Sequence, residues 1–140
     1  QKFAYHEPKL EQIFSLLVEV SPKIAEHGTL NFCLSNGQAL FAYATTQLHW
    51  LVREYPFKPA KLIDLDVEVD FSQLTTAEDR VAVITTEPLT NNEQWTTFIP
   101  GEMILFQHGR PTRNQLTRVE RLERERLNPA LKRTTAADQY

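Results

Sequence analysis

The chain has 140 residues and 41% hydrophobic content, which is enough for one compact domain with its own core. Its 15 Lys and Arg against 18 Asp and Glu make an acidic balance that argues against nucleic acid as a partner. One cysteine excludes an internal disulfide framework and predicts a reducing, cytoplasmic setting, and no apolar run reaches the roughly 18–20 residues of a membrane span, so we expect no membrane association.

The first predicted element is a helix over residues 6–28. Pro8 suits its first turn and Gly28 suits a cap at its C-terminal end. Pro22 has no N–H to donate and its ring crowds the preceding turn, so we predict a kink or a restart there. The apolar residues that recur at helical spacing are Leu10, Ile13, Phe14, Leu17, Val20 and Ile24.

Three strands are predicted next. Residues 30–35 alternate between apolar and polar side chains, and Asn36-Gly37 then signals a hairpin with a type I′ turn, which needs positive φ at both positions. Residues 38–46 return as the second strand and residues 47–54 form the third. In the third strand one face carries Leu48, Trp50 and Val52, and the other carries His49, Leu51 and Arg53.

The middle of the chain continues as strands joined by loops. Two prolines keep residues 55–64 out of regular structure. Residues 65–71 alternate again, residues 80–87 are almost continuously apolar and are therefore expected to be buried on both faces, and residues 102–108 complete the set. One long helix followed by a mainly antiparallel sheet makes the predicted fold class α+β.

Charge divides the chain after residue 109. Residues 1–109 hold 7 Lys and Arg and 14 Asp and Glu, whereas residues 110–140 hold 8 and 4. We therefore predict a body over 1–109 and a basic helical tail over 110–140, with the helix itself over residues 113–127. Whether this tail packs on the body or links to another subunit stays open.

Four acidic residues share one face of a predicted strand: Asp64, Asp66, Glu68 and Asp70. Alternate carboxylates could hold a hard cation, but Val69 occupies the place where a calcium loop needs glycine. We favour a polar strand face that discourages edge pairing. Since the four histidines also lack metal-ligand spacing, we predict no metal and no cofactor.

Cys33 and His49 could form a nucleophile pair across neighbouring strands, because an imidazole stabilises a thiolate. Cys33 lies in the middle of a strand, however, where small buried cysteines are common, so we favour a packing role. His49 beside Trp50 could line a ligand pocket, although a half-buried histidine with its hydrogen bonds satisfied is the simpler interpretation.

The segment "TTEPLTNNEQW", residues 85–95, is the most informative polar stretch. Its glutamate follows a buried strand, at a strand end where sites gather, and its proline stops the strand ladder. Its two asparagines tolerate turn conformations. Packing and function are equally compatible with this composition. The candidate site residues are Glu87, Asn92, Glu93 and Trp95.

Three segments in register resemble a known family: "GTLNFCLSNGQALFAYATTQLHWLVRE", "DLDVEVDF" and "DRVAVITTEPLTNNEQWTTFIPGE". Together they are similar to the C-terminal half of class II glutamine amidotransferase domains, most of all to the stand-alone YafJ-type members. The likeness covers residues 10–108, approximately, and says nothing about the tail.

The resemblance implies half of an N-terminal nucleophile hydrolase fold, in which two sheets lie between two helix layers (αββα). It also implies hydrolysis of the side-chain amide of glutamine to glutamate and ammonia. In the family, an N-terminal cysteine attacks the amide, its α-amino group is the base, and a γ-glutamyl thioester forms beside an oxyanion hole. The implied substrate is a small molecule, and no cofactor or metal is implied.

The sequence departs from the family at its first residue, which is Gln1 and not the nucleophilic cysteine. The family's other catalytic motifs also belong to the N-terminal half; Asn36-Gly37 matches a hairpin of the C-terminal half, and Cys33 does not match the nucleophile. We therefore predict no catalytic residue in these 140 residues. Because a native chain starts with Met, we also expect a processed chain or part of a longer one. The four candidate residues are expected to support a pocket whose reactive groups lie upstream.

Three alternatives remain. The chain could be a non-catalytic binding or structural domain derived from the same fold, a γ-glutamyl amide hydrolase of the same family, or an unrelated α+β hydrolase that uses Cys33 and His49. In every interpretation in which the chain is half of the family's sandwich, an apolar face would be exposed, so we expect the isolated chain to dimerise or aggregate as a homo-oligomer unless the missing half is supplied.

Overall fold

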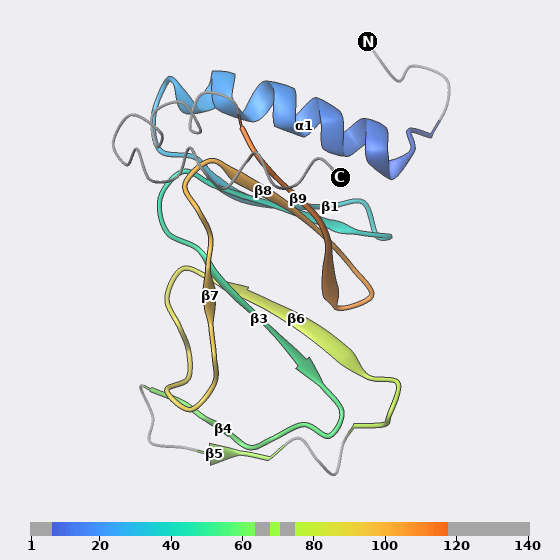
Figure 1. The fold of residues 1–140 in the computed structure, drawn as a ribbon, viewed down its shortest axis with the longest axis vertical. Coiled ribbons are helices and arrows are strands. Elements are labelled where there is room, and N and C mark those ends of the chain that lie inside the picture. Colours follow the sequence, from blue (N-terminus) through green and yellow to red (C-terminus); the bar gives the residue numbers. More distant parts are fainter. Residues whose placement is uncertain (1–6, 64–67, 71–74, 118–140) are drawn as a thin grey trace, which may run out of the picture.

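The computed structural model describes residues 7–63, 68–70 and 75–117, which stack as a helix, a four-stranded sheet and a three-stranded sheet (Figure 1). The predicted α+β class, with one long helix followed by antiparallel strands, is confirmed. The elements are α1 (Leu10–Ala25), β1 (Asn31–Ser35), β2 (Leu40–Ala44), β3 (His49–Glu54), β4 (Ala60–Lys61), β5 (Glu68–Val69), β6 (Arg80–Thr85), β7 (Thr96–Thr97), β8 (Glu102–Gln107) and β9 (Arg110–Leu116).

Helix α1 forms because its apolar side chains share one face, and that face is buried on the larger sheet. The helix is shorter than predicted: Pro8 precedes it, Gly28 lies beyond its end, and residue 6 is outside the described part. The predicted restart at Pro22 is wrong, since the helix continues to Ala25 and the Glu26 N–H donates to the Pro22 carbonyl at 3.1 Å.

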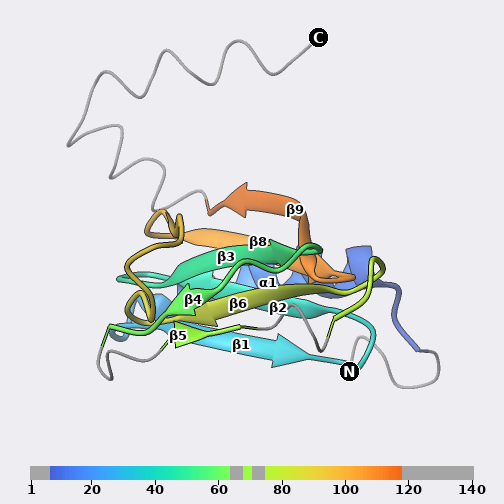
Figure 2. The same cartoon turned by 90° about the horizontal axis from the view of Figure 1, so that it is seen from below.

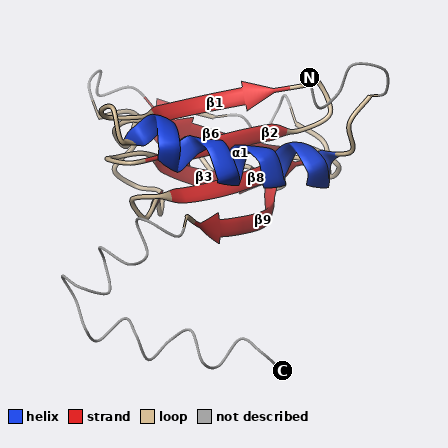
Figure 3. Ribbon diagram, turned by 90° about the horizontal axis from the view of Figure 1, so that it is seen from above, coloured by secondary structure: helices blue, strands red, loops and turns tan. Residues whose placement is uncertain are grey.

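The four-stranded sheet, sheet A, has the antiparallel order β1-β2-β8-β9 and is covered by α1 on one face (Figure 3). Its first hairpin is confirmed, but the connection is a four-residue loop, 36–39, in which only Gly37 has positive φ. Asn36 instead bonds through its side chain to the N–H groups of Gln38 and Ala39, which explains why no type I′ turn is needed. The core between α1 and sheet A contains Phe14, Ala39, Phe41, Tyr43, Met103 and Leu105.

The three-stranded sheet, sheet B, has the order β6-β3-β7 and packs against the other face of sheet A (Figure 2). The alternation predicted for β3 is confirmed, because Leu48 and Trp50 point into the core between the sheets. The prediction that β6 is buried on both faces is wrong: β6 is an edge strand, and Val81 is 48% exposed. The buried residues of this core are Ala42, Ala44, Leu48, Phe98, Ile104 and Phe106.

Two predictions about the loops and the tail need correction. The predicted loop 55–64 contains the short strand β4, which pairs with β5, and the rest of the predicted strand 65–71 lies largely outside the described residues. The predicted helix 113–127 is wrong over residues 113–116, which belong to strand β9, and the remainder lies outside the described residues. Pairing with β8 outweighs the local helical pattern.

The turn between β8 and β9 shows why the predicted boundary at residue 109 falls inside a hairpin. His108 and Gly109 have φ of 50° and 70°, so this is the two-residue turn with positive φ that strongly twisted hairpins favour. A Cβ at Gly109 would overlap the carbonyl of Arg80, so the turn also lies against the start of β6. Among the described residues, no helix is long and apolar enough to cross a membrane.

Candidate functional site

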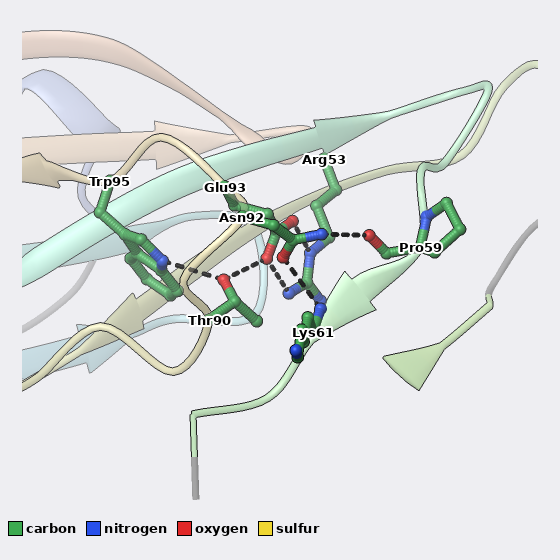
Figure 4. Close-up of polar contacts among 7 residues, drawn as sticks. All are labelled: Arg53, Pro59, Lys61, Thr90, Asn92, Glu93 and Trp95. Carbon is green, nitrogen blue, oxygen red and sulfur yellow. Dashed lines mark hydrogen bonds and ion pairs between the residues drawn. The ribbon is translucent and has the colours of Figure 1, made fainter. Parts of the chain in front are cut away.

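The structure separates the predicted site residues into two places. Asn92, Glu93 and Trp95 lie together in the connection between β6 and β7, beside Arg53 of β3 (Figure 4). Glu87, at the end of β6, contacts a different group of residues near the start of β3. We name the first group, with Arg53 and Thr90, the Arg53 cluster.

A bidentate ion pair between Arg53 and Glu93 is the centre of the Arg53 cluster. The Arg53 guanidinium donates from Nε to Glu93 Oε1 at 2.8 Å and from its Nη2 atom to Oε2 at 2.7 Å. The two side chains are only 18% and 15% exposed, so water weakens this pair less than it would on the surface. The pKa of Glu93 is lowered, mainly because Arg53 donates a hydrogen bond to its carboxylate. Partial burial acts in the opposite direction, and the Thr90 hydrogen bond and the positive charge of Arg53 lower the pKa further.

Thr90 extends the ion pair to the aromatic residue of the segment. Its hydroxyl donates to Glu93 Oε2 at 2.6 Å and accepts the indole N–H of Trp95 at 3.1 Å. Thr90 is itself buried, and so its hydroxyl needs both partners. The chain Trp95–Thr90–Glu93–Arg53 therefore fixes this connection onto β3 (Figure 4).

Asn92 joins two segments that are distant in sequence. Its amide nitrogen donates to the Pro59 carbonyl at 2.9 Å, and its amide oxygen accepts the Lys61 N–H at 2.9 Å. Backbone bonds from Asn91 to Lys61 and from Ile63 to Leu89 continue the same junction. Both ends of the Asn92 amide are thus used within the protein, which makes its role here structural.

A cavity of 630 Å³ lies beside the Arg53 cluster. Its charged lining includes the Arg53–Glu93 pair, whose opposite charges lie 2.7 Å apart. Among the described residues that line it there is no cysteine, serine or histidine that could act as a nucleophile or a transferable base. The lining residues are Leu51, Val52, Arg53, Glu54, Pro56, Phe57, Lys58, Pro59, Asn92, Glu93 and Gln94.

The second group is the His49 cluster, which comprises Gln47, His49, Glu87 and Thr97. The Gln47 amide nitrogen lies 3.0 Å from His49 Nε2 and donates to Glu87 Oε2 at 3.5 Å, while His49 Nδ1 lies 3.0 Å from the Thr97 hydroxyl. Each ring nitrogen of His49 therefore has one polar partner within the cluster. His49 is buried, whereas Glu87 presents an exposed carboxylate at the strand end.

Sequence reasoning missed Gln47 and Thr97. Alternation along the third strand placed His49 on the face that turns away from sheet A, and that part is correct. The contact with Thr97 depends on the pairing of His49 with Thr97 across β3 and β7, which no local pattern reports.

The proposed pair of Cys33 and His49 is not formed. Cys33 is on β1 of sheet A and His49 on β3 of sheet B, so the two are not on neighbouring strands. Cys33 is exposed, which corrects the expectation of a buried cysteine, and partial burial raises the pKa of its thiol, the opposite of activation. The arrangement of the strands therefore does not support an unrelated hydrolase that uses Cys33 and His49 as a pair.

The acidic strand gives no metal site in the described part of the chain. Asp64 and Asp66 lie outside the described residues, as does the side chain of Glu68. Within residues 7–63, 68–70 and 75–117, no three His, Cys, Asp or Glu side chains are grouped so that they could hold a metal ion.

Comparison with known proteins agrees with the family resemblance. A family model described as "Glutamine amidotransferases class-II" matches residues 1–130. The Escherichia coli (strain K12) protein named "Putative glutamine amidotransferase YafJ" is 41% identical over 109 residues, which are 78% of this chain and 43% of that protein. A Haemophilus influenzae protein named "Putative glutamine amidotransferase" is 43% identical over 102 residues, which are 73% of this chain and 35% of that protein.

A solved structure has the same arrangement. The crystal structure of a predicted glutamine amidotransferase from Pseudomonas aeruginosa matches with a TM-score of 0.68 and 37% sequence identity, over 80% of this chain and 45% of that one. The chain thus spans less than half the length of each of these relatives.

Proposed function

This chain belongs to the class II glutamine amidotransferase family, and we propose that it is the C-terminal, supporting half of a domain that hydrolyses the side-chain amide of glutamine or of a γ-glutamyl compound. The substrate is a small molecule, and the reactive groups come from an N-terminal segment outside these 140 residues. The single cysteine is our basis for assigning the protein to the cytoplasm.

This proposal rests on one combination of features. The two polar clusters are held by networks of hydrogen bonds, and neither cluster contains a nucleophile. Both polar clusters lie at strand ends and loops of sheet B, where substrate-binding groups gather, yet neither contains a cysteine or serine. Cys33, exposed on sheet A, has a raised thiol pKa and no histidine on a neighbouring strand. The reaction therefore needs a nucleophile from elsewhere in the domain.

The chemistry follows from the family assignment. The sulfur of an N-terminal cysteine bonds to the amide carbon of the substrate. The thiol proton passes to the α-amino group of that same cysteine and from there to the leaving nitrogen. Ammonia departs as the C–N bond breaks, leaving a γ-glutamyl thioester. Water then attacks the thioester carbon, which releases glutamate and restores the thiol.

Within this scheme the two clusters have different roles. The exposed carboxylate of Glu87 lies at the end of β6 and is oriented through Gln47, so Glu87 is the residue of this chain that we place nearest the substrate pocket. The Arg53 cluster holds the connecting segment that follows Glu87 onto β3. Glu93, Asn92 and Trp95 thereby support the pocket without touching the substrate.

The test is an ammonia-release assay on the protein with its cysteine-led segment. We expect glutamine or a γ-glutamyl amide to be hydrolysed, and a Ser replacement of the leading cysteine to lower the rate by at least ~10³-fold. The 140-residue chain alone should release no ammonia. If the intact protein hydrolyses none of these amides, the alternative of a non-catalytic domain derived from the same fold takes the place of this proposal.

A further inference from the structure

A second cavity, of about 400 Å³, opens between the two sheets on the side where β7 and β9 form the edges (Figures 2 and 3). We name it the β7–β9 cavity. Both sheets contribute to its walls: Trp50 of β3 and Thr96 of β7 belong to sheet B, and Ile104 of β8 and Asn114 of β9 belong to sheet A. Because packed sheets lie roughly 10 Å apart, the cavity is a narrow slot that suits a small molecule.

A buried carboxylate lines this cavity. Glu102, the first residue of β8, is only 7% exposed. Its Oε2 atom accepts the Ile99 N–H at 3.0 Å, and its Oε1 atom accepts an N–H of the Asn114 side-chain amide at 3.1 Å. Both donors are neutral groups. Since each carboxylate oxygen has two lone pairs, each can accept one more hydrogen bond from a ligand in the cavity.

No cation of the described chain balances the charge of Glu102. Glu102 takes part in none of the ion pairs that the described residues form. Arg113 also lines the cavity, but its guanidinium lies over the Phe14 ring, 4.3 Å from the ring centroid, and therefore on the α1 side of sheet A. A buried carboxylate that has only neutral donors is costly, and a positive charge brought beside it lowers that cost. A cationic ligand is the kind that this cavity would bind.

The rest of the lining suits an apolar chain attached to that cation. Trp50 contributes an indole ring, which also packs edge-to-face against Phe106 with ring centroids 5.7 Å apart. Ile99 and Ile104 add aliphatic surface. An indole ring attracts a nearby cation and also buries methylene groups. An ammonium group on a short alkyl chain therefore matches both the carboxylate and the apolar walls.

The same lining argues against an amino acid as the ligand. An amino acid carries a carboxylate beside its ammonium group, and a bound carboxylate needs a cation or several N–H donors. Among the described residues of the lining, Arg113 is the only Lys, Arg or His, and its guanidinium lies on the other face of sheet A. The ligand class that fits is thus an amine without a carboxylate.

From these observations we infer that the β7–β9 cavity binds a primary alkylammonium ion. The ammonium group lies between the Glu102 carboxylate and the Trp50 indole, and the alkyl chain lies along Ile99 and Ile104. The ammonium group has three N–H donors, which can use the free lone pairs of Glu102. Hydrolysis of a γ-glutamyl alkylamide releases an amine of this class, so the proposed function would supply the ligand, but binding does not depend on that reaction.

A ligand series on the intact protein tests this inference without any turnover. n-Butylammonium should shift the methyl NMR resonances of Ile99 and Ile104 saturably at neutral pH, and the Ile13 methyl, between α1 and sheet A, is the internal control that should stay unchanged. n-Butanol has the same chain without the charge and should bind roughly tenfold or more weakly. Glutamine should not displace n-butylammonium. Equal affinities for the amine and the alcohol, or no saturable shift, would overturn the inference.

Matched charge substitutions locate the site. Glu102→Gln keeps the shape of the side chain and an oxygen acceptor for the Ile99 N–H but removes the charge, so it should weaken n-butylammonium binding roughly tenfold or more. Glu11→Gln removes one charge from an exposed position on α1 and should leave the affinity within about twofold of the wild-type value at physiological salt. Equal weakening in the two variants would mean that only the net charge attracts the amine, which contradicts a site at Glu102.

A third variant leaves the Glu102 hydrogen bonds in place and tests the aromatic wall. Trp50→Leu keeps an apolar side chain but removes the ring, so the preference for n-butylammonium over n-butanol should fall about threefold or more. Trp50→Phe should retain part of that preference. An unchanged preference in folded Trp50→Leu would contradict the placement of the ammonium group beside the indole.

Binding and activity separate this inference from the proposed function. An intact protein that binds n-butylammonium in the β7–β9 cavity but hydrolyses no amide would support the site and remove the proposed function. An intact protein that hydrolyses an amide but does not bind the amine would support the proposed function and overturn the site.

Discussion

Glu87 and Glu93 belong to one short polar segment, but they end in two different environments. Glu93 is mostly buried, with Arg53 and Thr90 donating to its carboxylate, whereas Glu87 is exposed and meets the Gln47 amide at 3.5 Å. A carboxylate that is surrounded by short donors stabilises a fold, and one left at a strand end is available to a ligand. The comparison distinguishes a carboxylate held by short hydrogen bonds in the Arg53 cluster from an exposed one in the His49 cluster, and the proposed function assigns support to the first and the reaction side to the second.

The largest expected effect is on the buried ion pair. Glu93→Ala should lower the free energy of unfolding by about 2–3 kcal/mol, because it leaves the Arg53 guanidinium and the Thr90 hydroxyl without their main acceptor. Urea unfolding of the intact protein measures this. Glu87→Ala is the matched control and should change the same quantity by less than about 0.5 kcal/mol. Equal losses in the two variants would erase the distinction between the clusters.

A smaller effect is expected at Asn92, which is exposed and whose lost hydrogen bonds water can partly replace. Asn92→Ala should lower the free energy of unfolding by about 1 kcal/mol. It should also speed hydrogen exchange at the Lys61 amide, since that N–H loses its side-chain acceptor, without changing exchange at the Ala42 amide inside sheet A. Unchanged exchange at Lys61 would mean that the backbone bonds alone hold the two segments together.

Acid should weaken the Arg53 cluster selectively. The pKa of Glu93 is lowered in the folded protein, so its contribution to stability is complete above the ordinary glutamate pKa of about 4.3 and is lost as the pH falls below that value and through the lowered pKa. The stability difference between the wild type and Glu93→Gln should therefore be constant near neutral pH and shrink in this acidic range. A difference that stays constant throughout the acidic range would show that the carboxylate charge is irrelevant.

The smallest change in stability is expected at Glu87, where the functional consequence should be clear. The free energy of unfolding of Glu87→Gln should lie within about 0.5 kcal/mol of the wild-type value. In the intact protein, however, this variant should hydrolyse the amide substrate roughly tenfold or more slowly than the wild type. Glu93→Gln measured at a temperature where it is folded should keep its kcat. If Glu87→Gln has normal kinetics, the His49 cluster does not face the reaction.

Much of the fold could be predicted from local pattern. Helical spacing predicted α1, strict alternation predicted the two faces of β3, and Asn36-Gly37 predicted the first hairpin, because each of these features depends on neighbours a few residues away. The motifs in register also indicated the family. The amphipathic patterns therefore determined which side chains share a face.

Tertiary structure decided everything that depends on a distant partner. Residues 113–116 have a helical pattern but pair with β8, and β6 is apolar throughout but is the edge of sheet B. The candidate residues were predicted as one group, and cross-strand contacts to Arg53 and Gln47 divided them.

The sequence by itself therefore determined the class of fold, the family and the residues that carry polar chemistry. Only the tertiary structure decided which strands are edges, which carboxylate is mostly buried and which is exposed. The physical reason is that side-chain periodicity is a local property of the backbone, whereas strand order and burial arise from contacts between segments far apart in the chain.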